Sequence, residues 1–205
     1  MFQNASSFRQ ELSQWKLDNC ENVSNMFAFA ASFNGDLSGW QFPKVTDMSG
    51  MFAATPAFEG RGMSGWNVAS VTLMHGMFDL APVFNGDLSR WEVGEVTNMS
   101  RMFSGASRFN GDLRRWNVSM VRFMNQMFMG ASRFVGEGLS EWNVSKLREM
   151  TSMFENAISF NGNLSAWDVS SVSVATDAFN GASNFNHEHK PSFPSTTILD
   201  VPAVV

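Results

Sequence analysis

The amino-acid sequence predicts a repeat solenoid in which each coil contributes a short parallel β-strand and a short helical turn. Two observations predict this fold class. Large apolar residues return every 25 or 26 residues, and within each period the apolar spacing changes from strand-like alternation to helical spacing. A single coil of this length cannot bury its apolar face alone, so the coils must stack and share one core.

Three columns of aromatic residues carry the period. They contain all seven tryptophans and sixteen of the twenty phenylalanines, and the chain has no tyrosine. The steps of 26 residues coincide with one extra residue in the stretches 58–63 and 134–139, where a glycine absorbs the insertion. We therefore expect about seven repeats over residues 1–185, followed by a tail or cap over 186–205. The columns are Trp15, Trp40, Trp66, Trp91, Trp116, Trp142 and Trp167; Phe2, Phe27, Phe52, Phe78, Phe103, Phe128, Phe154 and Phe179; and Phe8, Phe33, Phe58, Phe84, Phe109, Phe134, Phe160 and Phe185.

Each unit contains three predicted elements. Residues 37–45 read L-x-x-W-x-F-x-x-V, which is close to the leucine-rich-repeat spacing, and the alternation in their middle predicts a short half-buried strand. In residues 48–55 the apolar side chains lie at i, i+3, i+4 and i+7, which predicts one face of a short helix. The triplet Asn34-Gly35-Asp36 and its equivalents supply a turn, since these residues tolerate positive φ.

Composition excludes several classes of protein. The chain has 205 residues, 14 Lys plus Arg and a net charge of −5, which disfavours nucleic acid as a partner. No run of 18 apolar residues is present, so no transmembrane segment is expected. Cys20 is the single cysteine, so no intramolecular disulfide can form.

The unit from Phe84 to Ala106, F-N-G-D-L-S-x-W-x-V-x-x-V-T-x-M-S-x-M-F-x-x-A, closely resembles the BspA-like leucine-rich repeat, a mycoplasma-type domain of unknown function. The resemblance covers about residues 1–185. It implies a right-handed solenoid displayed on a microbial or protist cell surface, with adhesion or host-protein binding and no catalysis. From these residues we expect no leader peptide, lipid-attachment cysteine or carboxy-terminal anchor, and localisation at the cell surface or outside the cell is expected from the resemblance alone.

The residues that flank the tryptophan column are predicted to form an ordered grid on the sheet face. The grid is small and polar and contains no aromatic anchor, which suits weak, polyvalent contact with carbohydrate or an extended protein. A solvated face without a ligand is the alternative. Arg90, Glu92 and Arg115 form the cluster to test first. The candidate binding residues are Lys16, Gln41, Asn67, Arg90, Glu92, Arg115, Asn117, Glu141, Asn143 and Asp168.

Apolar residues at otherwise polar positions of the repeat suggest docking to another protein, although scattered exposed apolar residues are common. The first coil starts inside a repeat without a capping sequence, and the tail leaves the register, so we expect the tail to cap the last coil or to bind a partner. These features support an alternative function, a structural linker or scaffold subunit of a larger multi-protein complex. The candidate docking residues are Leu73, Leu80, Met120, Phe123 and Met129.

Catalytic and metal chemistry finds little support in the sequence. His187 and His189 have a metal-ligand spacing but no further Cys or His nearby. Turn carboxylates such as Asp87 could collect calcium if stacked, but their column is interrupted by Gly62, Gly138 and Asn163. We therefore expect a non-enzymatic, adhesin-like module that recognises protein or glycan and uses no cofactor or metal.

Overall fold

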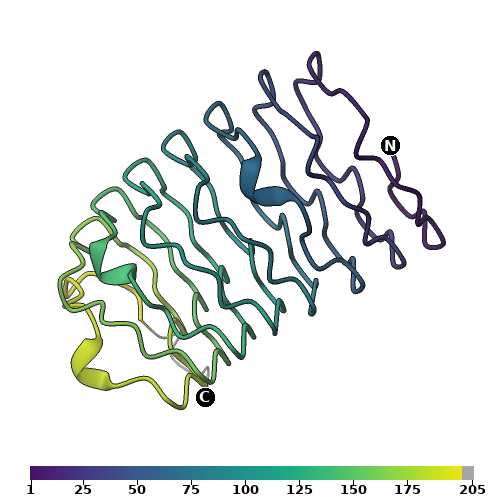
Figure 1. The fold of residues 1–205 in the computed structure, drawn as a ribbon. Helices are drawn as coiled ribbons and strands as arrows, with labels where there is room; N and C mark the ends of the chain where they lie inside the picture. The colour runs from purple at the N-terminus through teal and green to yellow at the C-terminus, as the bar shows by residue number, and fades with distance from the viewer. Residues whose placement is uncertain (200–205) are drawn as a thin grey trace.

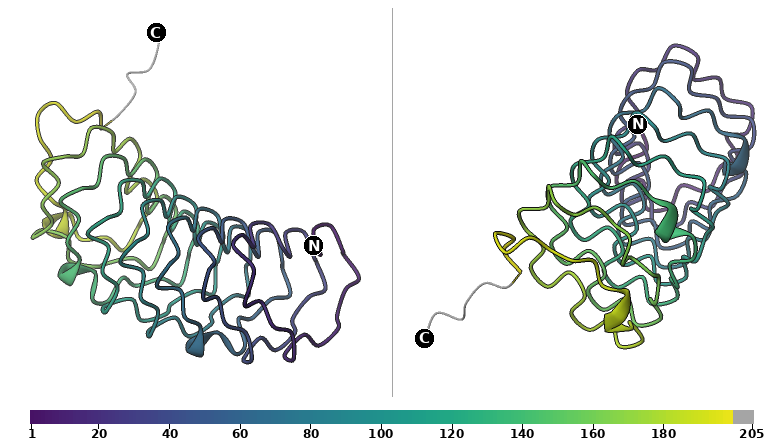
Figure 2. Two further views of the ribbon diagram at one scale, coloured as in Figure 1. Left: turned by 90° about the horizontal axis from the view of Figure 1, so that it is seen from above. Right: turned by 90° about the vertical axis from the view of Figure 1, so that its left-hand side faces the viewer.

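In the computed structural model, which describes residues 1–199, the backbone winds in successive coils that lie directly on one another (Figure 1). Parallel bridges join equivalent residues of neighbouring coils, from Asn22 and Asp47 at one end to Val174 and Ile198 at the other. The stack bends into a shallow arc (Figure 2). One core therefore runs the length of the described chain.

Regular secondary structure is scarce in residues 1–199. Three short 3-10 helices are present: η1 over Met63–Gly65, η2 over Leu139–Glu141 and η3 over His187–His189. The two longer repeats hold η1 and η2, and each of these helices follows a glycine in the left-handed region, Gly62 or Gly138, both at φ 79°. The extra residue of these repeats is thus accommodated in a turn before the tryptophan.

The predicted strand does not occur where the sequence placed it. We call residues 37–45 and their equivalents the Trp wall. Within the described residues, no backbone hydrogen bond joins the tryptophan-flanking positions of adjacent Trp-wall segments. The indole rings set the spacing there, because the centroids of stacked indole pairs lie 5.8 Å apart for Trp66–Trp91 and 6.5 Å apart for Trp116–Trp142. Backbone pairing needs strands about 4.8 Å apart.

The predicted helical turn is also wrong, and its segment provides the backbone pairing instead. In residues 23–30, alternate N–H groups bond within the coil and between coils. Met26 donates to the Val23 carbonyl at 3.2 Å, whereas Asn25 donates to the Ser49 carbonyl of the next coil at 2.8 Å. We call residues 22–30 and their equivalents the turn ladder. Every second donor finds a partner in the adjacent coil, which a helix could not provide because it satisfies its own donors.

The turn ladder depends on two columns of residues with positive φ. One column contains Gly50, Gly76 and Arg101, and the other contains Gly105 and Gly130, together with their equivalents. Non-glycine residues adopt the left-handed conformation at a cost of roughly 1–2 kcal/mol each. Glycine, asparagine or aspartate therefore occupies many of these positions. The full columns are Asn25, Gly50, Gly76, Arg101, Gln126, Ser152 and Asp177, and Asn4, Phe29, Ala54, Leu80, Gly105, Gly130, Asn156 and Gly181.

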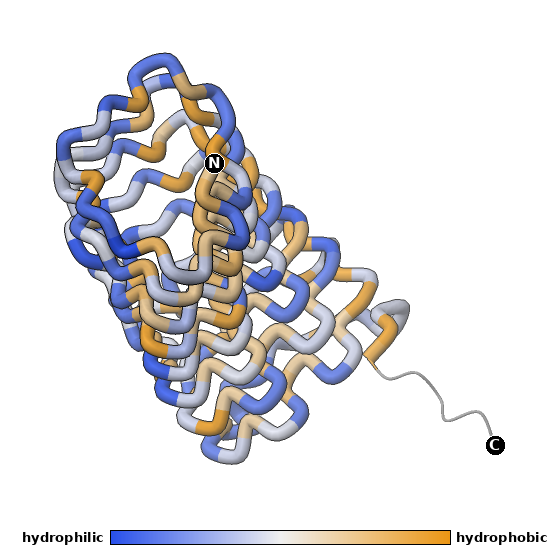
Figure 3. The backbone as a smooth tube through the Cα atoms, turned by 90° about the vertical axis from the view of Figure 1, so that its right-hand side faces the viewer, coloured by the Kyte–Doolittle hydropathy of each residue, from blue (hydrophilic) through white to orange (hydrophobic). Residues whose placement is uncertain are grey.

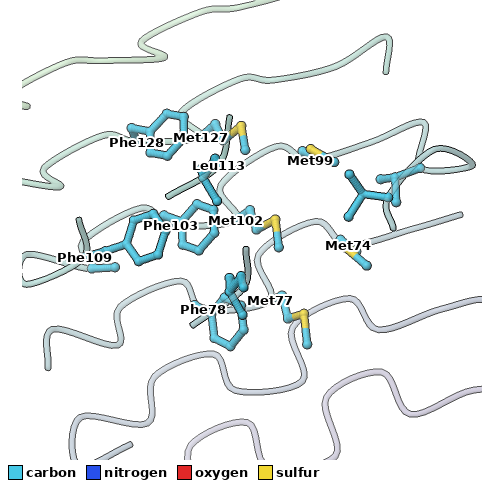
Figure 4. Packing of buried hydrophobic residues seen from close by; sticks show 14 of the residues in the cluster. Met74, Met77, Phe78, Met99, Met102, Phe103, Phe109, Leu113, Met127 and Phe128 are labelled. Atoms are coloured by element: carbon cyan, nitrogen blue, oxygen red, sulfur yellow. The ribbon is translucent and has the colours of Figure 1, made fainter. Parts of the chain in front are cut away.

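Stacked phenyl rings fill the core beneath the turn ladder. Phe103 lies 3.9 Å from Phe109 in its own coil and 5.5 Å from Phe128 in the next, measured between ring centroids. Methionines such as Met102 line the same core in register (Figure 4). Hydrophobic positions recur at the same place in successive coils (Figure 3). The phenylalanine columns expected from the sequence are therefore stacks of rings in contact from coil to coil.

The tryptophans contribute a polar interaction as well as bulk. Each indole N–H from Trp40 to Trp167 donates to a carbonyl in the preceding coil; Trp91 donates to Met63 at 2.9 Å and Trp116 to Leu88 at 3.0 Å. The same Met63 carbonyl also accepts the backbone N–H of Trp66. These bonds fix the register of each coil on the one before it.

The bend of the stack follows from its two spacings. Coils approach closely along the turn ladder, where backbone hydrogen bonds join them, and lie further apart along the Trp wall, where rings stack. The Trp wall must therefore form the outer side of the arc. Figure 2 agrees, since η1 and η2, which directly precede Trp66 and Trp142, lie on the outer side of the bend.

The described part of the tail, residues 186–199, lies on the last coil. His189 accepts a backbone hydrogen bond from Leu164, and the Thr197 hydroxyl donates to the Val172 carbonyl at 2.8 Å. Ile198 pairs with Val174 as a further step of the ladder. The rest of the predicted tail, residues 200–205, falls outside the described residues.

Replacing Trp91 with phenylalanine should lower the free energy of unfolding by about 2 kcal/mol, because the variant loses the bond to Met63 and leaves space in the core. Trp15→Phe is the matched control, since Trp15 is 38% exposed. Urea unfolding followed by circular dichroism measures both variants. Equal losses in the two variants would contradict the role assigned to the indole bond.

Gly130→Ala should destabilise the protein by about 1 kcal/mol through backbone strain alone, because Gly130 has φ 67° and an added Cβ would meet nothing closer than 3.9 Å. Gly65→Ala is the control, since an added Cβ there meets no atom within 4 Å and φ is not in the left-handed region. Thermal unfolding should show a lower Tm for the first variant and an unchanged or raised Tm for the second. An unchanged Tm for Gly130→Ala would rule out the strain.

Candidate functional site

All ten candidate binding residues lie on the outer side of the Trp wall, and all ten are exposed. In the middle coils the alternating residues between them, such as Trp91, Val93 and Trp116, point inward and are at most 3% exposed. The alternation predicted for this segment therefore holds, and it presents a file of polar side chains from each coil. Within the described residues, no backbone-to-backbone hydrogen bond joins the tryptophan-flanking positions of neighbouring coils, so this surface is the convex side of the arc and not a paired sheet.

Two adjacent grooves open between the coils of the Trp wall. The first has a volume of about 340 Å³ and is lined by Gly65, Asn67, Arg90 and Glu92, among others. The second, of about 380 Å³, continues the surface past Glu92 to Gly94, Arg115 and Asn117.

Glu92 lines both grooves, so it forms the ridge between them. The glycines keep the grooves open because they carry no side chain; a Cβ added to Gly65 would stand in open space. The cluster that the sequence singled out, Arg90, Glu92 and Arg115, is thus divided between two adjacent grooves of the Trp wall: Arg90 lines the first, Arg115 the second and Glu92 both.

The charges of this cluster are not neutralised by each other. Within residues 1–199 the ion pairs join Arg61 to Glu59, Arg101 to Asp79, and Arg114 to Asp112 and Glu137. None of these involves Arg90, Glu92 or Arg115. Two cationic groups and one carboxylate therefore face solvent from grooves that a ligand could enter.

Neighbouring turn carboxylates are held in their ionised form. The Ser89 backbone N–H, 3.0 Å from Asp87, lowers the pKa of that carboxyl group, with smaller help from the Ser89 hydroxyl and Arg90. The backbone N–H of Arg114 does the same for the pKa of Asp112, assisted by Arg114 and Arg115. Both carboxylates flank the cluster with fixed negative charge.

Several grid residues have a structural role that the sequence reasoning missed. Asn117 Oδ1 accepts the backbone N–H of Ser119 at 3.2 Å, and Asn143 Oδ1 accepts that of Ser145 at 3.1 Å. Asn67 and Asp168 cap their turns in the same way. The signal was present as Asn or Asp two residues before a small residue, the signature of an Asx turn.

The candidate docking residues do not form one patch. Leu73 and Phe123 form parallel bridges to equivalent residues of the neighbouring coils, at the start of the turn ladder. Both are half-buried, as are Met120 and Met129. Leu80, which is 55% exposed, instead lines a separate apolar groove of about 430 Å³ that none of the other four reaches. Phe29, 54% exposed, lines the same groove. The prediction missed it because it treated each deviation from the repeat separately.

Among residues 1–199, no group of three or more His, Cys, Asp or Glu side chains is placed to hold a metal ion. His189 Nδ1 lies 3.1 Å from the Asn161 carbonyl, and the His187 ring stands edge-on to Phe185.

No helix in the described part of the chain is long and apolar enough to cross a membrane.

Comparison with known proteins gives one match. A family model described as "Mycoplasma protein of unknown function, DUF285" matches three overlapping stretches, residues 1–62, 46–138 and 113–198. Together these stretches cover all the coils. No curated protein and no solved structure matches the chain.

The lowered pKa values predict a dependence of stability on pH. A carboxyl group whose folded pKa is depressed stabilises the fold above its unfolded pKa, near 3.8, and this contribution disappears as the pH falls through the folded value. The double variant Asp87→Asn/Asp112→Asn should keep both turns, as Asn163 does with Ser165, and should lose less stability between pH 5 and pH 2. Urea unfolding at several pH values measures this. Glu95→Gln is the control, and an identical pH profile for all three proteins would refute the assignment.

Proposed function

Since the chain belongs to the DUF285 family of mycoplasma proteins of unknown function, we propose a function from its surface: a non-enzymatic recognition module that binds protein or glycan through the convex Trp wall. The observation that carries this proposal is the pair of adjacent grooves lined by Arg90, Glu92 and Arg115. Polar, shallow and repeated depressions suit many weak contacts spread along an extended ligand.

The finer assignment, to BspA-like leucine-rich repeats, is part of the same proposal. The unit from Phe84 to Ala106 supports it, as does the stacking of 25-residue and 26-residue coils. The structure departs from the leucine-rich-repeat pattern in its backbone hydrogen bonds. In the described residues these bonds join neighbouring coils along the turn ladder and not at the tryptophan-flanking positions. We propose a right-handed solenoid displayed at a cell surface as an adhesin, in keeping with that resemblance.

The alternative function, a scaffold subunit of a larger assembly, would use different residues. It draws support from the exposed Phe29 and Leu80 in the apolar groove, and less from Phe123 and Met129, which are half-buried. An assembly role predicts that Leu80→Asp removes the protein from its complex while Arg90→Ala leaves it there.

Binding experiments test the leading proposal. The folded protein is screened against a glycan array and a panel of purified extracellular proteins, and the affinity of any ligand is then measured for Arg90→Ala and Arg115→Ala. Each substitution should weaken binding by about five- to tenfold, because it removes one charge-assisted contact. The melting temperature and the monomeric state should stay unchanged. Arg61→Ala is the control, since Arg61 is paired with Glu59 and lines neither groove. Ligands that bind all variants equally would overturn the assignment of the grooves.

A further inference from the structure

Basic residues are concentrated in the middle of this acidic chain. Residues 101–148 contain eight Arg or Lys and three Asp or Glu, a net charge of +5, whereas the whole chain carries −5. The remaining residues therefore carry −10. The overall charge conceals a basic band two coils wide, and its sign is opposite to that of the two ends.

Most of this positive charge is unpaired. Within the described residues, only Arg101 and Arg114 of the eight basic side chains lie within ion-pair distance of a carboxylate. The other six are exposed. They are Arg108, Arg115, Arg122, Arg133, Lys146 and Arg148. Six uncompensated cations on two coils make this part of the surface attractive to an anion.

The stacking brings three of these cations together at one corner, where the Trp wall meets the turn ladder. Arg122 and Arg148 occupy the same position of consecutive coils, and the Arg148 N–H donates to the Arg122 carbonyl at 2.9 Å. Lys146 Nζ lies 3.0 Å from Met120 Sδ of the preceding coil, so the Lys146 ammonium group extends over the same two coils. The carboxylate of Glu149, the residue after Arg148, accepts a hydrogen bond from the Asn125 amide at 2.8 Å. In three earlier coils threonine holds the position of Arg122, as Thr46, Thr72 and Thr97.

We propose that Arg122, Lys146 and Arg148 form a binding site for an anionic polysaccharide, one that carries sulfate or carboxylate groups along its length. This inference rests on the proposed recognition function and names the chemistry of its ligand. Cations repeated at the coil spacing match a linear chain of repeated anions. The exposed amides of Asn117 and Asn143 on the same two coils offer hydrogen bonds to sugar hydroxyls.

The surroundings of the cluster favour a polysaccharide over other polyanions. Single-stranded nucleic acid is held by stacking of bases on aromatic side chains. Among the described residues, the exposed large apolar side chains are Met1, Trp15, Phe29, Leu80, Ile158 and Ile198, and none belongs to residues 101–148. A tightly bound acidic peptide would need apolar pockets for its aromatic or aliphatic anchors. The apolar groove at Phe29 and Leu80 reaches residues 101–148 only at Gly105.

The test uses heparin as a sulfated polysaccharide, with the whole protein in solution at 0.15 M salt. Arg122→Gln/Arg148→Gln should weaken heparin binding by at least about tenfold, because two charge-assisted contacts are lost. The matched control is Arg108→Gln/Arg133→Gln, which removes the same charge from the same coils. These two residues follow the turn ladder, whereas Arg122 and Arg148 precede it, and this control should change the affinity less than about twofold. Circular dichroism melting verifies that both variants fold.

Three results would overturn the inference: no binding of heparin by the wild type, equal weakening by the two double variants, or tighter binding of single-stranded DNA of equal charge than of heparin. Failure here is distinguishable from failure of the proposed function. If another ligand binds, its affinity depends on Arg90 and Arg115, and heparin does not bind, the recognition function is supported and the polysaccharide site is rejected. If heparin binding depends on Arg122 and Arg148 while Arg90→Ala and Arg115→Ala affect no ligand, the binding role of the grooves is rejected and the polysaccharide site is supported.

Discussion

The hydrogen bond from each buried indole N–H to a carbonyl of the preceding coil is the interaction on which the rest of the structure depends. It ties a large side chain to one backbone atom, so a coil cannot slide along its neighbour without leaving a buried donor unsatisfied. These bonds measure 2.7–3.1 Å over six consecutive coils. With the register fixed, phenylalanine lies on phenylalanine along the stack, and methionine lies on methionine until Ala175 and Ala178 replace it in the last coil. Tyrosine would place its polar group at the end of the ring, where these columns offer only other rings.

The same bond explains why the surface is organised in columns. Equivalent residues of neighbouring coils lie next to each other on the surface. Two neighbouring repeats that carry the same residue at one position therefore place two identical side chains side by side. Arg122 and Arg148 are adjacent for this reason, although they are 26 residues apart in the chain. The grooves at Glu92 have a related origin, because ring stacking holds the coils of the Trp wall further apart than a backbone ladder would.

The residue columns could be predicted from the sequence, and the backbone between them could not. The tryptophan and phenylalanine periods locate the core because bulky apolar side chains have few alternatives to burial. The segment from Met48 to Thr55 was misread as helical because its apolar spacing matches a helix, yet the same spacing arises from successive turns. Gly50 and Gly76 recur in one register, and Gly105 and Gly130 in another; this recurrence indicates positive φ, which argues against a helix. The exposed positions of the grid followed from alternation alone, whereas the grooves depend on the coil spacing, which no single repeat encodes. The basic band was missed because net charge averages over the chain.

Hydrogen exchange of the seven indole N–H groups, followed by NMR, tests the stacking register most directly. The account predicts six slowly exchanging indole protons, those of Trp40, Trp66, Trp91, Trp116, Trp142 and Trp167. It predicts one rapidly exchanging proton, that of Trp15, a residue that is 38% exposed. Similar exchange rates for all seven, or fast exchange of several tryptophans in the middle of the chain, would contradict it.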